Sequence, residues 1–149
     1  MKKICFLAKI LIIYLFFISS GFTAKSNYFD KGKILFDQKK FEKSKIFFER
    51  DIVFNPQSEK SYLYLAKIFN ENNNDQEEEM NLSNVLLLNP LNDEAIYMLT
   101  LLKIKQSDYS ESKELIKKFN LVCISFCLKK EEIQEKFDKL VPENARDNN

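Results

Sequence analysis

The chain has 149 residues, of which 45% are hydrophobic and 30% charged, and its formal net charge is +1 at neutral pH. It contains no histidine, which removes the commonest general base and the commonest metal ligand, and its two glycines are too few for a phosphate-binding glycine loop. We therefore expect no catalytic residues, no cofactor and no metal site, and we do not expect an enzyme.

The first 24 residues have the pattern of a secretory signal peptide. Lys2 and Lys3 precede an unbroken apolar stretch, residues 10–18, and small residues such as Gly21 and Ala24 follow it. A comfortable transmembrane helix needs about 20 apolar residues, so we expect cleavage after Gly21 or Ala24. An uncleaved N-terminal anchor is the alternative. The pattern predicts an exported protein of the periplasm or cell envelope, soluble if the signal is cleaved.

Export also changes the charge of the chain. Residues 1–24 hold three lysines and no acidic residue, which leaves 20 basic and 22 acidic residues and a net charge of −2. No stripe of lysine and arginine is left to neutralise phosphates, so we expect no nucleic-acid partner.

Two Asn-Pro pairs divide the remaining chain into units of equal length. Pro56 and Pro90 each end an apolar run, and the two runs match position for position. Proline cannot continue a helix and disfavours helical geometry at the residue before it, so each pair ends one helix and precedes the next unit. The interval between the two prolines gives repeats 25–58, 59–92 and 93–124. Two helices are expected in each, at about 27–38 and 41–54, 59–71 and 76–88, and 93–106 and 109–120.

The first repeat carries the residues of a known pattern. Tyr28, Gly32, Leu35, Phe48 and Pro56 match the aromatic, small, apolar, aromatic and proline positions of a helix–turn–helix unit whose period equals the interval from Pro56 to Pro90. On these residues the chain resembles the tetratricopeptide-repeat family over residues 25–124. The resemblance implies an all-α fold, a right-handed α-solenoid of three antiparallel helix pairs plus a C-terminal helix. A chance overlay of amphipathic helices is the alternative.

Three positions depart from this pattern. Glu78 stands where a small packing residue is expected, so the helix at 76–88 is expected to be rotated or frayed at its start. Asp51 occupies a tight position of the first repeat, and Ile124 stands where the third repeat would have its proline.

Cys123 and Cys127 are the two cysteines that follow the signal segment. An oxidising compartment permits a disulfide between them, and a bond over this spacing would favour a turn or distorted helix at 124–126. Two buried free cysteines are the alternative. Two thiolates alone do not complete a metal site.

A charged amphipathic segment follows the cysteines. Ile133, Phe137 and Leu140 recur at helical spacing, and Pro142 ends the segment. We expect residues 125–142 to form a helix that caps the last apolar face of the solenoid, and residues 143–149 to be a disordered tail.

The resemblance places a binding groove on the first helix of each repeat. Residues of equivalent register form three rows: Phe29, Leu63 and Tyr97; Lys33, Lys67 and Leu101; and Phe36, Asn70 and Ile104. Such a surface suits an extended or helical partner segment with apolar anchors and an acidic group opposite the two lysines. Plain packing between helices is the alternative for each residue.

These features favour an exported scaffold that binds a protein or peptide segment, of unknown identity, in its concave groove within the cell envelope. The alternative is a structural subunit of a larger envelope assembly, tethered to the membrane by an uncleaved N-terminus.

Overall fold

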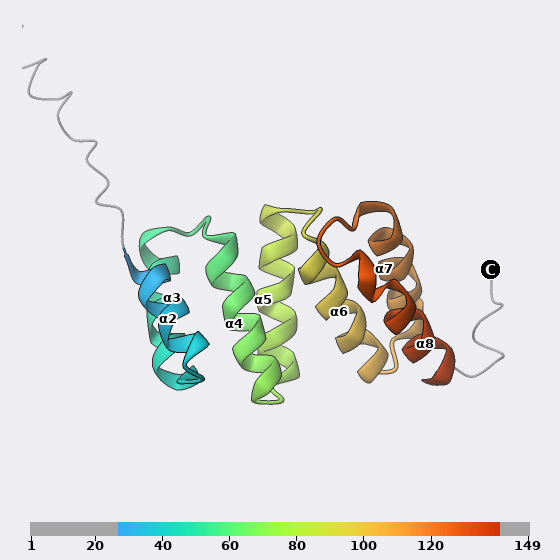
Figure 1. Ribbon diagram of the computed structural model, residues 1–149, viewed down its shortest axis with the longest axis horizontal. Coiled ribbons are helices and arrows are strands. Elements are labelled where there is room, and N and C mark those ends of the chain that lie inside the picture. Colours follow the sequence, from blue (N-terminus) through green and yellow to red (C-terminus); the bar gives the residue numbers. More distant parts are fainter. Residues whose placement is uncertain (1–26, 141–149) are drawn as a thin grey trace, which may run out of the picture.

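The computed structural model describes residues 27–140. The expected signal segment and the expected tail at 143–149 lie outside these residues. The described part is all-helical, and the helices follow one another along the long axis of the molecule (Figure 1). They are α2 (Tyr28–Asp37), α3 (Phe41–Phe54), α4 (Glu59–Glu71), α5 (Asp75–Leu88), α6 (Asp93–Lys105), α7 (Tyr109–Val122), the short 3₁₀ helix η1 (Cys127–Lys129) and α8 (Lys130–Leu140).

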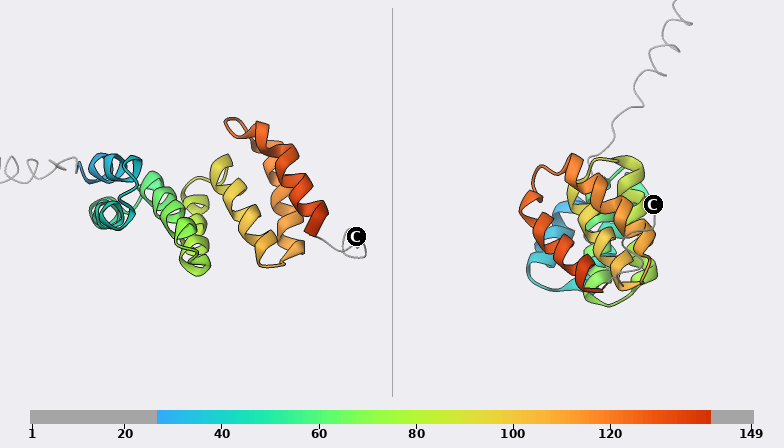
Figure 2. Two further views of the ribbon diagram at one scale, coloured as in Figure 1. Left: turned by 60° about the horizontal axis from the view of Figure 1, so that its bottom comes forward. Right: turned by 90° about the vertical axis from the view of Figure 1, so that its right-hand side faces the viewer.

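The helices form three antiparallel pairs, α2 with α3, α4 with α5 and α6 with α7, and α8 packs against α6 and α7 (Figure 2). This solenoid-like architecture confirms the predicted fold class. Its larger core cluster joins the second and third pairs to α8, and a smaller cluster around Phe48 joins the first pair to α4. Each pair therefore buries its apolar faces partly against the next pair, as expected for stacked repeats.

The repeat period is present in the backbone conformation itself. The turns within the three pairs contain Lys39, Asn73 and Ser107, which follow one another at the same interval as the two prolines and have φ values of 58°, 53° and 63°. In each turn the N–H of the next residue donates to a carbonyl five residues earlier, at 2.9 Å in all three. A left-handed residue with this bond is a common way to end a helix. The repeat is thus structural and extends over all three units.

The close approach of α2 and α3 requires a glycine. A Cβ on Gly32 would lie 2.7 Å from the ring of Phe48, and the hydroxyl of Ser44 donates to the Gly32 carbonyl at 2.7 Å. The equivalent positions in the other pairs, Ala66 and Thr100, are also fully buried.

Gly32→Ala is expected to destabilise the protein although alanine is the better helix former. The gain in helix propensity is about 1 kcal/mol, whereas forcing a methyl group into a packed core costs about 1–3 kcal/mol. The Phe48 ring cannot move away easily, because Phe29 and Tyr64 pack against it. Urea unfolding of Gly32→Ala in two backgrounds, wild type and Phe48→Leu, measures this effect. The loss of stability should appear in the wild-type background and be absent where leucine replaces Phe48. An increase in stability in the wild-type background would contradict the steric argument.

The structure corrects the expectation that Glu78 disturbs α5. The helix is regular from Asp75, and the side chain of Asn74 caps it by accepting the N–H of Glu77 at 3.3 Å. Glu78 is only 1% exposed, and the side-chain amide of Asn70 lies 3.0 Å from both carboxylate oxygens. Burial raises the pKa of Glu78, and the hydrogen bond from Asn70 partly offsets this rise. A hydrogen-bond partner on α4 therefore accommodates the buried acid.

Asp51, the other acid at a tight position, is held in a similar way. One of its carboxylate oxygens accepts from the hydroxyls of Ser58 and Ser61, both at 2.6 Å. These bonds connect the end of α3 to the start of α4, so this polar residue helps to join the first repeat to the second.

The C-terminal helix covers the end of the solenoid. Ile133 and Phe137 are buried in the larger core cluster, as the capping role requires. Leu140, expected on the same face, is instead exposed, because it is the last residue of α8 and lies beyond the covered surface. None of the helices within residues 27–140 is long and apolar enough to cross a membrane.

Candidate functional site

The first predicted row of groove residues meets three different environments. Phe29 is half-buried, with its ring centroid 5.6 Å from that of Tyr64. Leu63 is only 8% exposed and belongs to the larger core cluster. Tyr97 lies beneath the C-terminal segment, and its hydroxyl donates to Glu132 at 2.9 Å. Only Phe29 of this row lies on an uncovered part of the first-helix face.

The lysines of the second row differ in how they are held. The Nζ of Lys67 is 4.8 Å from the ring centroid of Tyr64 and 2.7 Å from a carboxylate oxygen of Glu94. Lys33 is exposed and pairs at 2.7 Å with the aspartate four residues later on α2. Leu101 is half-buried against the larger core cluster.

The third row contains one buried residue and two with accessible surface. Phe36 is half-buried, 5.0 Å from Tyr64 between ring centroids, and Asn70 binds Glu78 as described above. Ile104 is 4% exposed. The structure thus corrects the groove assignment for Leu63 and Ile104, because their side chains are buried among neighbouring helices and leave no surface for a partner.

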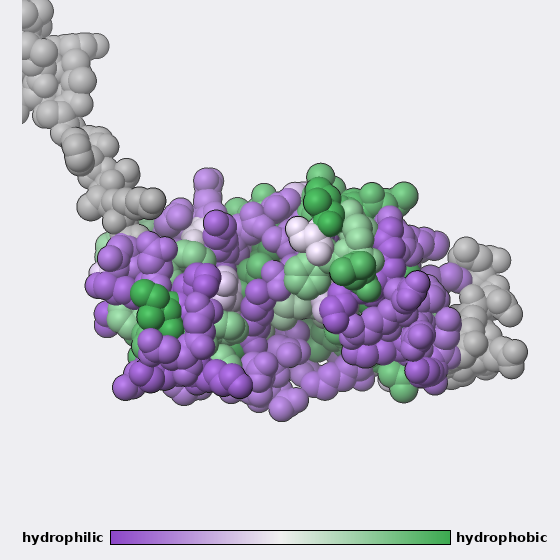
Figure 3. Space-filling view, viewed as in Figure 1, coloured by the Kyte–Doolittle hydropathy of each residue, from purple (hydrophilic) through white to green (hydrophobic). Residues whose placement is uncertain are grey.

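The uncovered residues of α2 and α4 form one continuous site around Tyr64. Besides the residues already named, it includes the exposed Lys60, whose Nζ lies 6.0 Å from the centroid of the Phe29 ring. We call this site the aromatic–lysine face; it consists of Phe29, Lys33, Phe36, Lys60, Tyr64 and Lys67. The first-helix side of the molecule shows patches of apolar surface among hydrophilic side chains (Figure 3).

The C-terminal helix α8 covers the first-helix side of the molecule at the third repeat. The carboxylate of Glu132 accepts hydrogen bonds from Lys129, Lys136 and Tyr97 at 2.6, 3.0 and 2.9 Å. These bonds lower the pKa of Glu132 to about 2, while burial and the bond to Glu132 raise the pKa of Tyr97 to about 12. The ring of Tyr97 is further covered by Phe126. The accessible part of the first-helix side is therefore the part on α2 and α4.

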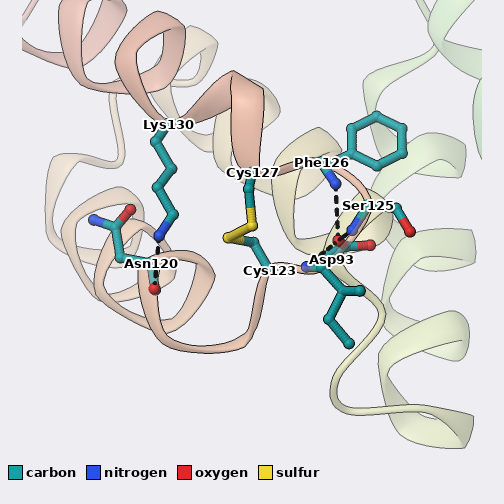
Figure 4. The surroundings of a disulfide bond; sticks show 8 residues. Asp93, Asn120, Cys123, Ser125, Phe126, Cys127 and Lys130 are labelled. Atoms are coloured by element: carbon teal, nitrogen blue, oxygen red, sulfur yellow. Dashed lines mark hydrogen bonds between the residues drawn. A yellow bond between two sulfur atoms is a disulfide. The ribbon is translucent and has the colours of Figure 1, made fainter.

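A disulfide-closed loop connects α7 to α8. The Sγ atoms of Cys123 and Cys127 are bonded, and the three residues between them are not helical (Figure 4). One carboxylate oxygen of Asp93 accepts the backbone N–H groups of residues 124, 125 and 126 at 2.7, 2.6 and 2.9 Å. Burial opposes ionisation of Asp93, but these three donors outweigh it and lower its pKa. The loop is the kind of turn that the cysteine spacing favours for a disulfide.

The same arrangement occurs one repeat earlier. Glu59 is the first residue of the second repeat, as Asp93 is of the third, and its Oε1 accepts from the side-chain amides of Asn89 and Asn92 at 3.0 and 2.5 Å. In both repeats an acid at the first position holds the loop that follows the second helix. Sequence reasoning missed this pair. The available signal was an acidic residue at the first position of two successive repeats.

Eight of the twelve exposed large apolar side chains within residues 27–140 gather at one edge of the solenoid. This edge consists of the C-terminal ends of α3, α5 and α7 and the loops that follow them, at the top of Figure 1. Val53, Leu87 and Leu121, which occupy the same register position in the three repeats, are 75%, 79% and 86% exposed. We call these eight residues the apolar edge; they are Val53, Phe54, Leu87, Leu88, Leu91, Leu121, Ile124 and Leu128. In Figure 3 apolar surface is visible on the right half of the upper edge, whereas the left half is largely hydrophilic.

Similarity to other proteins does not assign a function to the aromatic–lysine face or to the apolar edge. No protein-family model matches the chain, and no curated protein matches it. Within residues 27–140, no three histidine, cysteine, aspartate or glutamate side chains are grouped so that they could hold a metal ion.

Proposed function

We propose that the protein is an exported scaffold of the tetratricopeptide-repeat type, which binds a protein or peptide segment on its aromatic–lysine face within the cell envelope. The observation that carries this proposal is the cluster of half-buried rings on α2 and α4 with three lysines around it, which α8 leaves uncovered. Aromatic clusters of this kind are frequent anchor sites in interfaces, because they bury much apolar area at little entropic cost.

The lysines indicate the chemistry of the partner. Lys33 is paired only with a carboxylate on its own helix, and such exposed pairs contribute no more than about 1 kcal/mol. A carboxylate of a bound segment can therefore replace that partner at little cost. Lys60 is exposed beside the ring of Phe29. A segment with aromatic or aliphatic anchors and acidic residues near them fits this face best.

Export is supported by two independent features of the chain. The charged start, apolar stretch and small residues of positions 1–24 are typical of a signal peptide. The disulfide between Cys123 and Cys127 is compatible with an oxidising compartment and would be unusual in a reducing one.

Reversing two charges of the aromatic–lysine face tests the proposal. The double variant Lys33→Glu, Lys60→Glu is expected to weaken partner binding by about tenfold or more, because like charges facing each other cost several kcal/mol. Affinity capture from envelope extract, followed by quantification of the proteins retained, measures the effect.

A matched control has the same change in net charge. Lys43→Glu, Lys117→Glu places both reversals at exposed positions of second helices, α3 and α7. Partners that bind the proposed face should be lost with the first variant and retained with the control. Equal retention by the wild type and both variants would contradict the assignment of the face.

A further inference from the structure

We propose that the apolar edge docks on the surface of a lipid bilayer. This surface is separate from the aromatic–lysine face, and the inference does not depend on a partner binding there.

The repetition shows that the exposed apolar residues are a regular feature of the fold. Single exposed apolar side chains are normal in soluble proteins, but the same register position is apolar and at least three-quarters exposed in all three repeats. These residues, Val53, Leu87 and Leu121, contribute little to the packing of the helix pairs. Because the pairs follow one another along the long axis, the three side chains are distributed along one edge of the molecule (Figure 1).

The loops of the edge are held in place, so their apolar side chains cannot simply fold back on the core. Glu59 binds the loop that carries Leu91, and Asp93 binds the loop that carries Ile124. The disulfide closes the second of these loops, next to Leu128. A line of apolar side chains on fixed, protruding loops fits a flat apolar surface better than it fits a peptide, which needs a groove.

The chain enters the solenoid at this same edge. α2 begins at Tyr28, whose ring stacks on that of Phe54 with 5.5 Å between the centroids. The apolar stretch of residues 10–18 is joined to Tyr28 by nine residues, which reach at most about 30 Å when extended. Whenever that stretch lies in a bilayer, Tyr28 and the adjoining end of the apolar edge at Phe54 are within this distance of the bilayer surface.

Charged side chains of both signs lie near the edge. The acids Asp51, Glu59 and Asp93 accept hydrogen bonds from neighbouring loops and helices. Arg50 and Lys118 lie three residues before Val53 and Leu121 on the same helices, α3 and α7. Basic side chains beside apolar ones are the combination by which peripheral proteins bind anionic lipid.

Single tryptophan reporters test this docking in the full chain, which has no tryptophan of its own. Leu87→Trp places the reporter on the apolar edge, at a position 79% exposed. Glu71→Trp is the control. Glu71 is exposed and lies at the end of α4 remote from the apolar edge, about 20 Å from the start of that helix at Glu59 for a helix of this length. Both variants are mixed with vesicles of phosphatidylethanolamine and phosphatidylglycerol, with and without brominated acyl chains.

Docking predicts that the emission of the reporter at position 87 shifts to the blue in vesicles and loses intensity with brominated lipid. The reporter at position 71 should keep the emission of a water-exposed side chain. Two results would overturn the proposal. One is a position-87 reporter that stays water-exposed and unquenched in vesicles. The other is a blue shift already present without vesicles: if it grows with protein concentration the edge binds a second copy, and if it does not the edge is covered by another part of the chain.

Discussion

Phe48→Ala is expected to lower the free energy of unfolding by about 3–5 kcal/mol, the range for removing a fully buried phenylalanine. Phe48 has no exposed surface, and it connects the first helix pair to the second through Phe29 on one side and Tyr64 on the other. The backbone beside it, at Gly32, is already as close as packing allows, so α2 cannot move inward much to fill the cavity. The loss is a large fraction of the stability of a domain this size.

The loss should be greatest at the N-terminal end of the solenoid. In stacked repeats each unit is stabilised mainly by its neighbours, so a defect at the first interface releases the end unit before the rest unfolds. Hydrogen exchange is therefore expected to show lost protection in α2 and α3 and near-normal protection in α6 and α7. Urea unfolding gives the total loss.

Phe54→Ala is the matched control, because it removes the same side chain from a position that is 67% exposed. Its effect should be within about 1 kcal/mol. Comparable losses for the two variants, or a Phe48→Ala loss spread evenly over all helices, would contradict the view that Phe48 holds the first repeat to the second.

Much of the fold could be predicted because the information is local and repeated. The two Asn-Pro pairs and the apolar spacing predicted the six paired helices to within one or two residues at each end. The small residues at positions 32, 66 and 100 are buried where helices approach, as the register indicates. A constant repeat period is thus enough to predict which helix each residue belongs to.

The surroundings of a residue could not be predicted in the same way. Leu63 and Tyr97 occupy equivalent positions, yet one is covered by the neighbouring helices of the solenoid and the other by the C-terminal segment. Glu78 was expected to disturb its helix and Asn70 to line the groove, and only the structure shows that they bind each other. The repeat register predicts where on a helix a residue lies. Whether its side chain is exposed depends on the helices and loops that pack against it in the folded protein.

The apolar edge was missed for a related reason. Val53, Leu87 and Leu121 lie in the last turns of their helices, where an apolar residue in sequence suggests burial. Their exposure follows from the direction of the helix ends and the position of the loops, which depends on the contacts of Glu59 and Asp93. Those contacts join the first residue of a repeat to the loop after its second helix, about 30 residues later, beyond the range of local sequence patterns.

Asp93→Ala is expected to destabilise the protein by about 2–3 kcal/mol at neutral pH. Hydrogen bonds to a charged group are each worth about 1.5–3 kcal/mol, but much of the loop is exposed, so water replaces part of what the three N–H groups lose. Asp93→Asn keeps an acceptor oxygen and removes the charge, so it should cost about half as much. Urea unfolding of the oxidised protein measures both.

The effect of Asp93 should depend on pH with a definite sign. Its pKa is lowered in the folded protein, so the native state holds the ionised form more strongly than the unfolded chain does. The stabilisation is then fully present above the ordinary aspartate pKa of about 3.9 and is lost as pH falls through the lowered folded-state value. The stability difference between the wild type and Asp93→Asn should therefore be constant around neutral pH and shrink toward zero in strong acid.

Reduction of the disulfide separates the two constraints on the loop. With Cys123 and Cys127 bonded, residues 124–126 remain in a closed turn even without the carboxylate, so exchange of their N–H groups should rise only moderately in Asp93→Ala. In the reduced protein the Asp93 carboxylate is the constraint that remains on the loop. There the same substitution should remove most of the exchange protection of the N–H groups of residues 124–126. Sites that share one loop are not independent, so the combined effect should exceed the sum of the two separate effects. If Asp93→Ala changed neither stability nor exchange in either redox state, the hydrogen bonds of Asp93 would not be what holds this loop at the apolar edge.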